Sequence, residues 1–388
     1  MSPTRWPSTT PADDPALVRN TWLGSRVLLA AVAVSVVAVG GRSWESVLGN
    51  WDVQHYMSIA RQGYADPLEM AFLPGLPALL RLGADLGVPM EVAGAVIALA
   101  SSALAAWALF RIGGTVPACL WLIAPTAVFT TVGYTEAPFC AAAFWAWERA
   151  RANHWWAAAL LAGLAATMRV SGLFLIGALA VMAVVGDGMD REPGRRRTKA
   201  PSAAQRVNHL ATLVIPVAVV AAFVVWLHHL TGSWTAWQQA QDRGWGRGFT
   251  TPAETWRNTL PATSAQTWRA TYGDHAGQVA AIFRLELVSV AVGVATTVYC
   301  LARRRWASAA WVGVQVVAFS IGHWYMSVNR AVLLWFPLMI ALAELTRGPD
   351  RPVGLRLAWR GIVGIGVVVA LVVMCWWGWL FYTGAWAS

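Results

Sequence analysis

A small group of ionisable residues stands at the ends of apolar runs in this sequence. Its members are Asp52, His55, Glu136, Arg169, His323 and Arg330. Ionisable side chains at such positions are costly unless they are paired or hydrated, which makes them candidates for function. A carboxylate can take the proton from an attacking hydroxyl group, and an arginine fork matches a phosphate in charge and geometry. The group therefore contains the residue types needed to displace a phosphate from a sugar carbon.

Asp52 lies in the segment WDVQHY, which runs from Trp51 to Tyr56. On a short helix, positions 52, 55 and 56 share one face, so Asp52 and His55 are expected to point into the same pocket. The alternative is that Asp52 caps a loop helix in water, which is a common role for aspartate. The sequence leaves the general base and the helix cap both open.

Two arginines are candidates for holding a phosphate. Arg169 follows a short apolar run, and Arg330 precedes another. The competing interpretation is that each one extends to a lipid headgroup, as single arginines at span ends often do. His323, seven residues before Arg330, could donate to the same phosphate or serve only as a structural residue.

Glu136 opens a predicted helix that has a proline one turn in, at Pro138. A cap at Thr135 and an acidic first turn explain this carboxylate in structural terms. Glu136 could instead bind sugar hydroxyls or tune a neighbouring residue, and the pattern does not decide among these roles.

The elements that position these residues are predicted to be membrane helices. Hydrophobic residues make up 57% of the 388 residues and charged residues 12%, about half the charged share of a soluble domain. The apolar residues come in long runs, which predicts one all-α polytopic membrane domain over 22–388. We place eleven spans at 22–41, 90–110, 114–132, 135–148, 155–168, 171–186, 208–230, 281–301, 307–323, 331–346 and 361–382.

The polar segments suggest how this domain is oriented. Residues 1–21 are Pro-rich and predicted to be a disordered cytoplasmic tail. With the N-terminus inside, 19 of the 29 basic residues fall on the inner side, including the clusters 195–199 and 303–305. The segments 42–89 and 231–280 then form long outer loops, and the tryptophans of the second suit a short amphipathic helix at the surface.

The composition also argues against several classes of function. The net charge of +10 is scattered between apolar runs, which is typical of membrane orientation and not of nucleic-acid binding. The four cysteines lack disulfide or zinc spacing, and there is no Walker loop, GxGxxG or HExxH motif. The 25 tryptophans suit both the headgroup region and stacking on sugar rings.

Four segments resemble, in order, the motifs of the PIG-V-like mannosyltransferase family, in its actinobacterial type. They are WDVQHYMSIARQGY (51–64) followed by AFLPGLP (71–77), YTEAPF (134–139), ATMRVSGL (166–173), and Arg330 with Phe336-Pro337. The departures are small: Leu73 and Gly75-Leu76 replace the usual FPLY core. The resemblance covers roughly residues 50–345.

The resemblance implies a GT-C-like fold, a mannosyl group taken from a polyprenyl-phosphate donor, and inversion at the anomeric carbon. It implies Asp52 as the base, and we expect the donor phosphate at Arg330, His323 and Arg169. Contacts to sugar or acceptor are expected from His55, Tyr56, Glu136 and Trp51. The residues require no cofactor or metal, since arginines can supply the positive charge; a divalent metal is not indicated.

The implied setting is a plasma membrane with the site on the extracytoplasmic side. The high Ala, Arg and Trp usage suggests a high-GC, actinobacterium-like source. The acceptor there would be a phosphatidylinositol mannoside, a lipoglycan or another cell-envelope glycan. The rival hypothesis is a transporter or lipid-linked-sugar flippase, which predicts inverted repeats and charges near mid-span. The sequence has no convincing repeat, and its ionisable residues gather at one face.

Overall fold

The computed structural model describes residues 13–188, 202–347 and 353–387. Within these ranges every regular element is a helix, which confirms the predicted all-α class, and β pairing is limited to an isolated bridge between Phe249 and Gly322. The α-helices are α1 (Pro15–Gly40), α2 (Trp44–Leu48), α3 (Asp52–Gln62), α4 (Gly75–Asp85), α5 (Met90–Gly113), α6 (Thr115–Leu122), α7 (Glu136–Arg151), α8 (Trp155–Met168), α9 (Ser171–Val185), α10 (Ala203–Thr212), α11 (Val214–Thr231), α12 (Ala236–Trp245), α13 (Pro252–Ala262), α14 (Ala265–Tyr272), α15 (Ala276–Ala302), α16 (Trp306–Ser320), α17 (Val328–Ala331), α18 (Phe336–Arg347) and α19 (Val353–Tyr382). The 3-10 turns are η1 (Pro67–Ala71), η2 (Ala127–Thr130), η4 (Gly273–His275) and η5 (Val332–Leu334).

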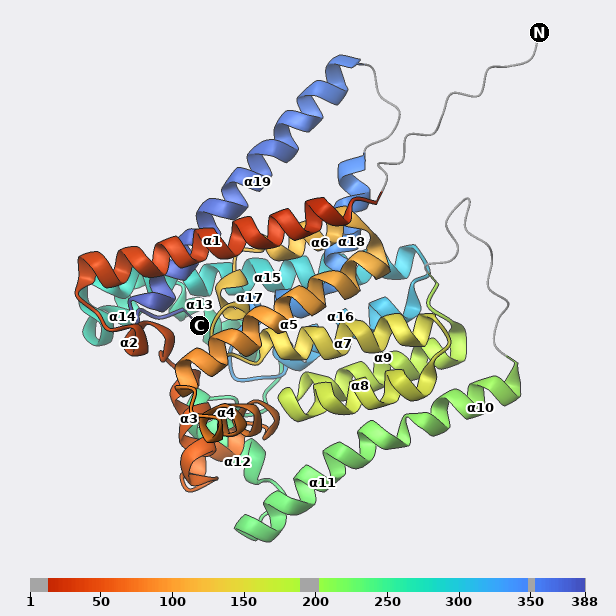
Figure 1. Cartoon of the computed structure of the whole chain (residues 1–388), viewed down its shortest axis with the longest axis horizontal. Coiled ribbons are helices and arrows are strands. Elements are labelled where there is room, and N and C mark those ends of the chain that lie inside the picture. Colours follow the sequence, from red (N-terminus) through yellow and green to blue (C-terminus); the bar gives the residue numbers. More distant parts are fainter. Residues whose placement is uncertain (1–12, 189–201, 348–352, 388) are drawn as a thin grey trace.

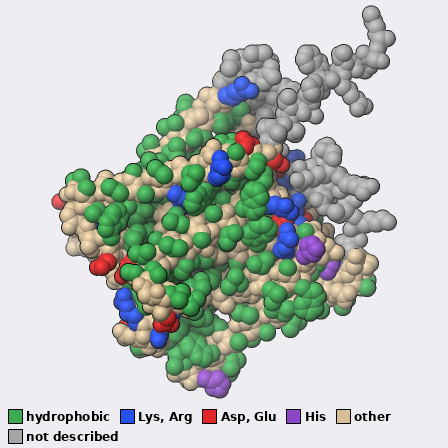
Figure 2. Space-filling model, viewed as in Figure 1, with side chains coloured by type: hydrophobic (Ala, Val, Ile, Leu, Met, Phe, Trp, Pro, Cys, Tyr) green, Lys and Arg blue, Asp and Glu red, His purple; other side chains and the backbone are tan. Residues whose placement is uncertain are grey.

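Several helical segments are long and apolar enough to cross a membrane. In the described residues they are Pro15–Gly40, Met90–Gly113, Ala203–Thr231, Ala265–Ala302 and Ala358–Tyr382. A sixth is the pair Val328–Leu334 and Phe336–Thr346, bent by 74°. Apolar side chains cover much of the face in Figure 2, with the few charged side chains mostly towards its edges. These features fit a multi-pass membrane protein, while eleven crossings remain a prediction.

Two sequence predictions need correction. Helix α1 begins at Pro15, because the Asp14 carboxylate accepts hydrogen bonds from the first backbone N–H groups and Pro15 suits the first turn. The tail prediction is therefore wrong for residues 15–21, while 1–12 lie outside the described residues. The span placed at 114–132 is also broken: α6 ends at Leu122, just before Pro125, which cannot continue a helix.

The two predicted outer loops lie at the same end of the bundle. Figure 1 shows α2, α3, α4, α12 and α14 gathered at the left of the view. The turns after α9 and after α15 also meet each other: a Cβ on Gly188 would lie 2.6 Å from the Arg304 carbonyl oxygen. The basic turn 303–305 therefore shares one end of the bundle with Gly188, while the cluster 195–199 lies outside the described residues.

The centre of the bundle is α7, whose residues are nearly all buried against α5, α8 and α9 (Figure 1). Small residues allow this close packing. A Cβ on Gly94 would lie 2.8 Å from the Gly133 Cα, so α5 presses directly on the loop that leads to Glu136. A Cβ on Gly172 would lie 2.4 Å from the Ala166 Cα, so glycine is what permits the sharp bend at Arg169 between α8 and α9.

Candidate active site

Asp52 is the first residue of α3, and its carboxylate points away from the helix axis. The residue before it, Trp51, has a φ of 58°, a conformation that is uncommon for a residue other than glycine. The Asp52 backbone N–H donates to the Tyr134 hydroxyl at 3.2 Å, and the Asp52 carboxylate accepts from Arg330 at 3.1 Å. The side chain therefore does not cap α3, and the interpretation of Asp52 as a solvated helix cap is wrong.

Arg330 lies on α17 and is the most connected cation of the site. Besides its bond to Asp52, its Nε is 3.5 Å from Glu136 Oε1, and its guanidinium lies over the Phe129 and Tyr134 rings. Its side chain is only 9% exposed. Arg330 is held inside the protein by charge and by ring faces, so it does not extend to a lipid headgroup.

Arg169 comes from the bend between α8 and α9. Its Nη1 donates to Glu136 Oε1 at 2.8 Å and to the Thr135 hydroxyl at 2.9 Å. Glu136 is fully buried, and it pairs with both Arg169 and Arg330. Headgroup contact is excluded for Arg169 too, and Glu136, expected to touch sugar, is instead the shared counterion of two arginines. Thr135 occupies the N-cap position of α7, but its hydroxyl accepts from Arg169 and makes no cap hydrogen bond.

Arg247 is a third arginine, which the sequence analysis missed. It follows α12, donates to the Ser327 hydroxyl at 3.0 Å and lies 3.5 Å from Gln241 Oε1. Burial, and next the charge of Arg330, lower the pKa of Arg247 to about 10, so it stays positive at neutral pH. Its signal in the sequence is an arginine flanked by glycines within a tryptophan-rich segment, at Gly246-Arg247-Gly248.

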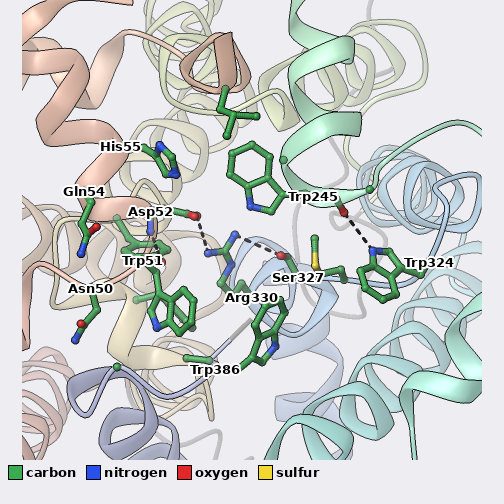
Figure 3. A pocket seen from close by; sticks show the side chains of 18 residues that line it. Asn50, Trp51, Asp52, Gln54, His55, Trp245, Trp324, Ser327, Arg330 and Trp386 are labelled. Atoms are coloured by element: carbon green, nitrogen blue, oxygen red, sulfur yellow. Dashed lines mark hydrogen bonds and ion pairs between the residues drawn. The ribbon is translucent and has the colours of Figure 1, made fainter. Parts of the chain in front are cut away.

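Two cavities of different character meet at Asp52 and Arg330. The larger has a volume of about 650 Å³ and is lined by aromatic residues, four of them tryptophans. Figure 3 shows Trp51, Trp245, Trp324 and Trp386 around Arg330. The smaller, about 80 Å³, is lined by Arg169, Arg247 and Arg330 together with Gln241, Thr135 and Tyr56. An anion suits the smaller cavity, and a ring-shaped polar ligand suits the larger one.

His55 and Tyr56, which share a helix face with Asp52, line different cavities. His55 lines the larger one, where its ring stacks on Phe72 at 5.0 Å between ring centroids. Tyr56 lines the smaller one, 3.5 Å from the Thr135 hydroxyl. Burial raises the pKa of Tyr56, with further contributions from Asp52 and Glu136, so it remains a neutral phenol. Asp52 lines both cavities.

His323 is the predicted site residue that the structure does not bring to the group. It is exposed and lines neither cavity, and its Nδ1 is 3.2 Å from the Asn258 amide nitrogen. The loop behind it is instead fixed by Glu286 of α15. That carboxylate accepts from the backbone N–H groups of Ser327 and Asn329, each at 2.9 Å. An acidic residue inside the apolar run 281–301 was the signal for Glu286.

Comparison with known proteins agrees with the resemblance noted in the motifs. Residues 23–187 match the family model described as Mannosyltransferase (PIG-V). The resemblance to that family is confirmed over this segment. The PIG-V match contains Asp52, Glu136 and Arg169, whereas Arg247 and Arg330 lie beyond it.

The curated relatives are similar over a limited part of the chain. The GPI alpha-1,6-mannosyltransferase 2 of Mus musculus is 35% identical, over 34% of this chain and 31% of its own length. The Homo sapiens protein of the same name is 30% identical over the same shares. The chain thus covers about a third of these relatives.

Two solved structures are similar over most of the chain. The Archaeoglobus fulgidus oligosaccharyltransferase, in its apo form, is 13% identical with a TM-score of 0.47, over 92% of this chain and 56% of its own. ArnT from Cupriavidus metallidurans, bound to undecaprenyl phosphate, is 14% identical with a TM-score of 0.47, over 92% and 76%.

Proposed function

We propose that this protein is a GT-C-type membrane mannosyltransferase. It would move a mannosyl group from a polyprenyl-phosphate donor to a glycan or glycolipid acceptor, with inversion at the anomeric carbon. The single observation that carries this proposal is the 3.1 Å contact between the Asp52 carboxylate and Arg330, two residues that line both the arginine-lined cavity and the aromatic one. The PIG-V match over residues 23–187 supports the sugar and the reaction class.

The smaller cavity suits the donor phosphate. Three guanidinium groups, those of Arg169, Arg247 and Arg330, line it, and two carboxylates lie among them, at Asp52 and Glu136. The net charge of these five groups is +1, which an incoming phosphodiester balances. Fixed donors aimed at the position where charge develops are usually the largest contribution to catalysis.

The reaction is a single displacement. Asp52 takes the proton of the acceptor hydroxyl as its oxygen bonds to the anomeric carbon. The bond from that carbon to the phosphate oxygen breaks, and its electron pair leaves with the polyprenyl phosphate. Arg330, Arg169 and Arg247 hold the charge that develops there. We propose that no metal is needed, so that a chelator such as EDTA leaves the rate unchanged.

The decisive experiment replaces the base. Purified Asp52→Asn protein is given polyprenyl-phosphate mannose with a radiolabelled sugar, and transfer is measured in the presence of a lipid glycan extract. We expect the rate to fall by about a hundredfold to ten-thousandfold, as for other lost general bases. The matched control is Asp85→Asn on α4, an exposed aspartate that pairs with Arg81, which should retain wild-type rates. Wild-type transfer by Asp52→Asn protein would rule Asp52 out as the base.

The proposed setting is a plasma membrane, with the N-terminus cytoplasmic and the site extracytoplasmic. The partners would be the lipid donor, the glycan acceptor and the surrounding lipids, and not nucleic acid. A single cysteine placed at Asp85, in a variant lacking the native cysteines, reports the side. A membrane-impermeant maleimide should label it in intact cells, and labelling only after lysis would contradict this orientation.

A further inference from the structure

The wall of the larger cavity opposite α12 is formed by a short strap, residues 383–387, that follows α19. Gly384, Trp386 and Ala387 of this strap line the cavity. Gly384 has a φ of 70°, which turns the chain back over the site. The strap is far in sequence from Asp52, yet it borders the same chamber.

Side chains from other parts of the chain hold the strap in place through its backbone. Trp51 donates from its indole to the Ala385 carbonyl at 3.1 Å, and Trp377 donates to the Ala387 carbonyl at 2.9 Å. Just before the strap, Asn50 donates to the Phe381 carbonyl at 2.8 Å. The strap is therefore fixed on both sides of Trp386, next to the residues that immediately precede the proposed base.

The Trp386 ring is held differently from its neighbours. Its centroid lies 5.9 Å from that of Trp51, 6.1 Å from Tyr272 and 6.4 Å from Phe283. The indole N–H groups of Trp51 and Trp324 donate to backbone carbonyls, but that of Trp386 has no hydrogen-bond partner in the described part of the chain. A buried N–H without a partner costs stability, so a hydrogen bond from this indole to a ligand hydroxyl would be favourable.

We propose that Trp386 is an acceptor-binding residue that stacks on a sugar ring one removed from the ring that reacts. This inference rests on the proposed function. Three observations carry it. The cavity of about 650 Å³ has room for more than one sugar ring, and much of its wall is aromatic. Trp386 also offers both an aromatic ring and an indole N–H group that has no hydrogen-bond partner among the described residues. Figure 3 shows Trp386 beside Trp51, on the side of Arg330 away from Trp245. The acceptor class is thus a glycan of at least two sugars.

The test compares two acceptor probes, octyl α-mannoside and octyl α-mannobioside, on the full-length purified protein with polyprenyl-phosphate mannose. We expect Trp386→Ala to raise the KM for the mannobioside about tenfold, the upper range for a lost aromatic contact. The KM for the mannoside, the donor KM and kcat should change by less than about twofold, because neither the donor cavity nor Asp52 is altered. Trp386→Phe should keep most of the affinity.

A matched control and a second variant test whether the effect is specific to the Trp386 ring. Trp379 lies on the exposed face of α19, 41% exposed, and Trp379→Ala should leave all constants unchanged. Trp386→Leu keeps an apolar side chain larger than that of alanine but without a ring face, and it carries the test if the alanine variant loses thermal stability. An unchanged mannobioside KM, or an equal rise for both probes, overturns the inference.

The inference and the proposed function fail in different ways. If wild-type protein releases mannose from the donor but transfers it to neither glycoside, the acceptor inference is wrong while the donor chemistry stands. If wild-type protein consumes no donor under any condition, the proposed function is wrong and the acceptor inference falls with it.

Discussion

The two cavities that meet at Asp52 are built in different ways. The smaller one takes its arginines from a helix bend, from α17 and from the loop after α12, and a fully buried carboxylate ties two of these arginines together. The larger one is walled by indoles from the residue before α3, from the end of α12, from the loop before α17 and from the strap, held mainly by single hydrogen bonds and ring contacts. In the proposed reaction, the chemical step would take place in the charge network and sugar recognition in the separately anchored aromatic cavity.

The largest effect should come from breaking the charge network at Arg330. Arg330→Lys keeps the positive charge but cannot contact Asp52, Glu136 and a phosphate together, because an ammonium lacks the planar fork. We expect transfer to fall by about a thousandfold, similar to the loss of one oxyanion-hole donor. The check is single-turnover transfer at saturating donor.

Its control is Arg284→Lys on α15, an exposed arginine whose Nε donates to a loop carbonyl. That variant should transfer at the wild-type rate. Near wild-type transfer by Arg330→Lys protein would show that a point charge is enough at this position.

The next largest effect is expected on the thermal stability of the protein. It tests the arginine network separately from the aromatic cavity. Glu136→Gln leaves Arg169 and Arg330 without their shared buried counterion, and removing one partner of a buried pair costs about 3–5 kcal/mol. We expect a clearly lower Tm in detergent together with reduced transfer. The same substitution at Glu45, an exposed residue in the first turn of α2, should leave the Tm unchanged. An unaltered Tm for Glu136→Gln would mean that the two arginines do not depend on this carboxylate.

A smaller effect is expected at Arg247, which contacts Ser327, Gln241 and the Met326 carbonyl but neither carboxylate of the network by a hydrogen bond in the described residues. Arg247→Gln should weaken donor binding, with a donor KM raised about tenfold to a hundredfold for a lost charge-assisted contact of about 1.5–3 kcal/mol. Arg243→Gln, one turn earlier and exposed, is the matched control. A higher KM for the acceptor in place of the donor would assign Arg247 to the other cavity.

The smallest effect belongs to His323. Its ring contacts Asn258 and Trp324 and lines neither cavity, so His323→Ala should change kcat and both KM values by less than about threefold. A loss as large as that expected for Arg247 would place this histidine in the donor site during turnover.

Local sequence signals predicted the helices well where apolar periodicity was uninterrupted. The span placed at 155–168 coincides with α8, and that at 171–186 ends one residue after α9. The early start of α1 was readable from Asp14 and Pro15, but proline-rich composition was taken as disorder. The break after α6 was readable from Pro125 and was lost within an apolar run.

The sequence predicted only those site residues that lie in recognisable motifs or at the ends of apolar runs. Asp52 and the arginines at 169 and 330 were singled out by residue type at span ends, and the structure brings them together. Arg247 and Trp386 were not found, because no local pattern tells which loop folds over a distant helix. Glu136 was singled out, but its two arginine partners were not, since whether a carboxylate faces a cavity or an arginine is decided by tertiary packing.

The contact between Asp52 and Arg330 has a kinetic consequence. Because Arg330 donates to Asp52, the proposed base would be freed for proton transfer when a bound anion draws the guanidinium towards the smaller cavity. Donor and acceptor are therefore expected to bind in order, donor first. This order predicts that polyprenyl phosphate, as a product, inhibits competitively with respect to the donor.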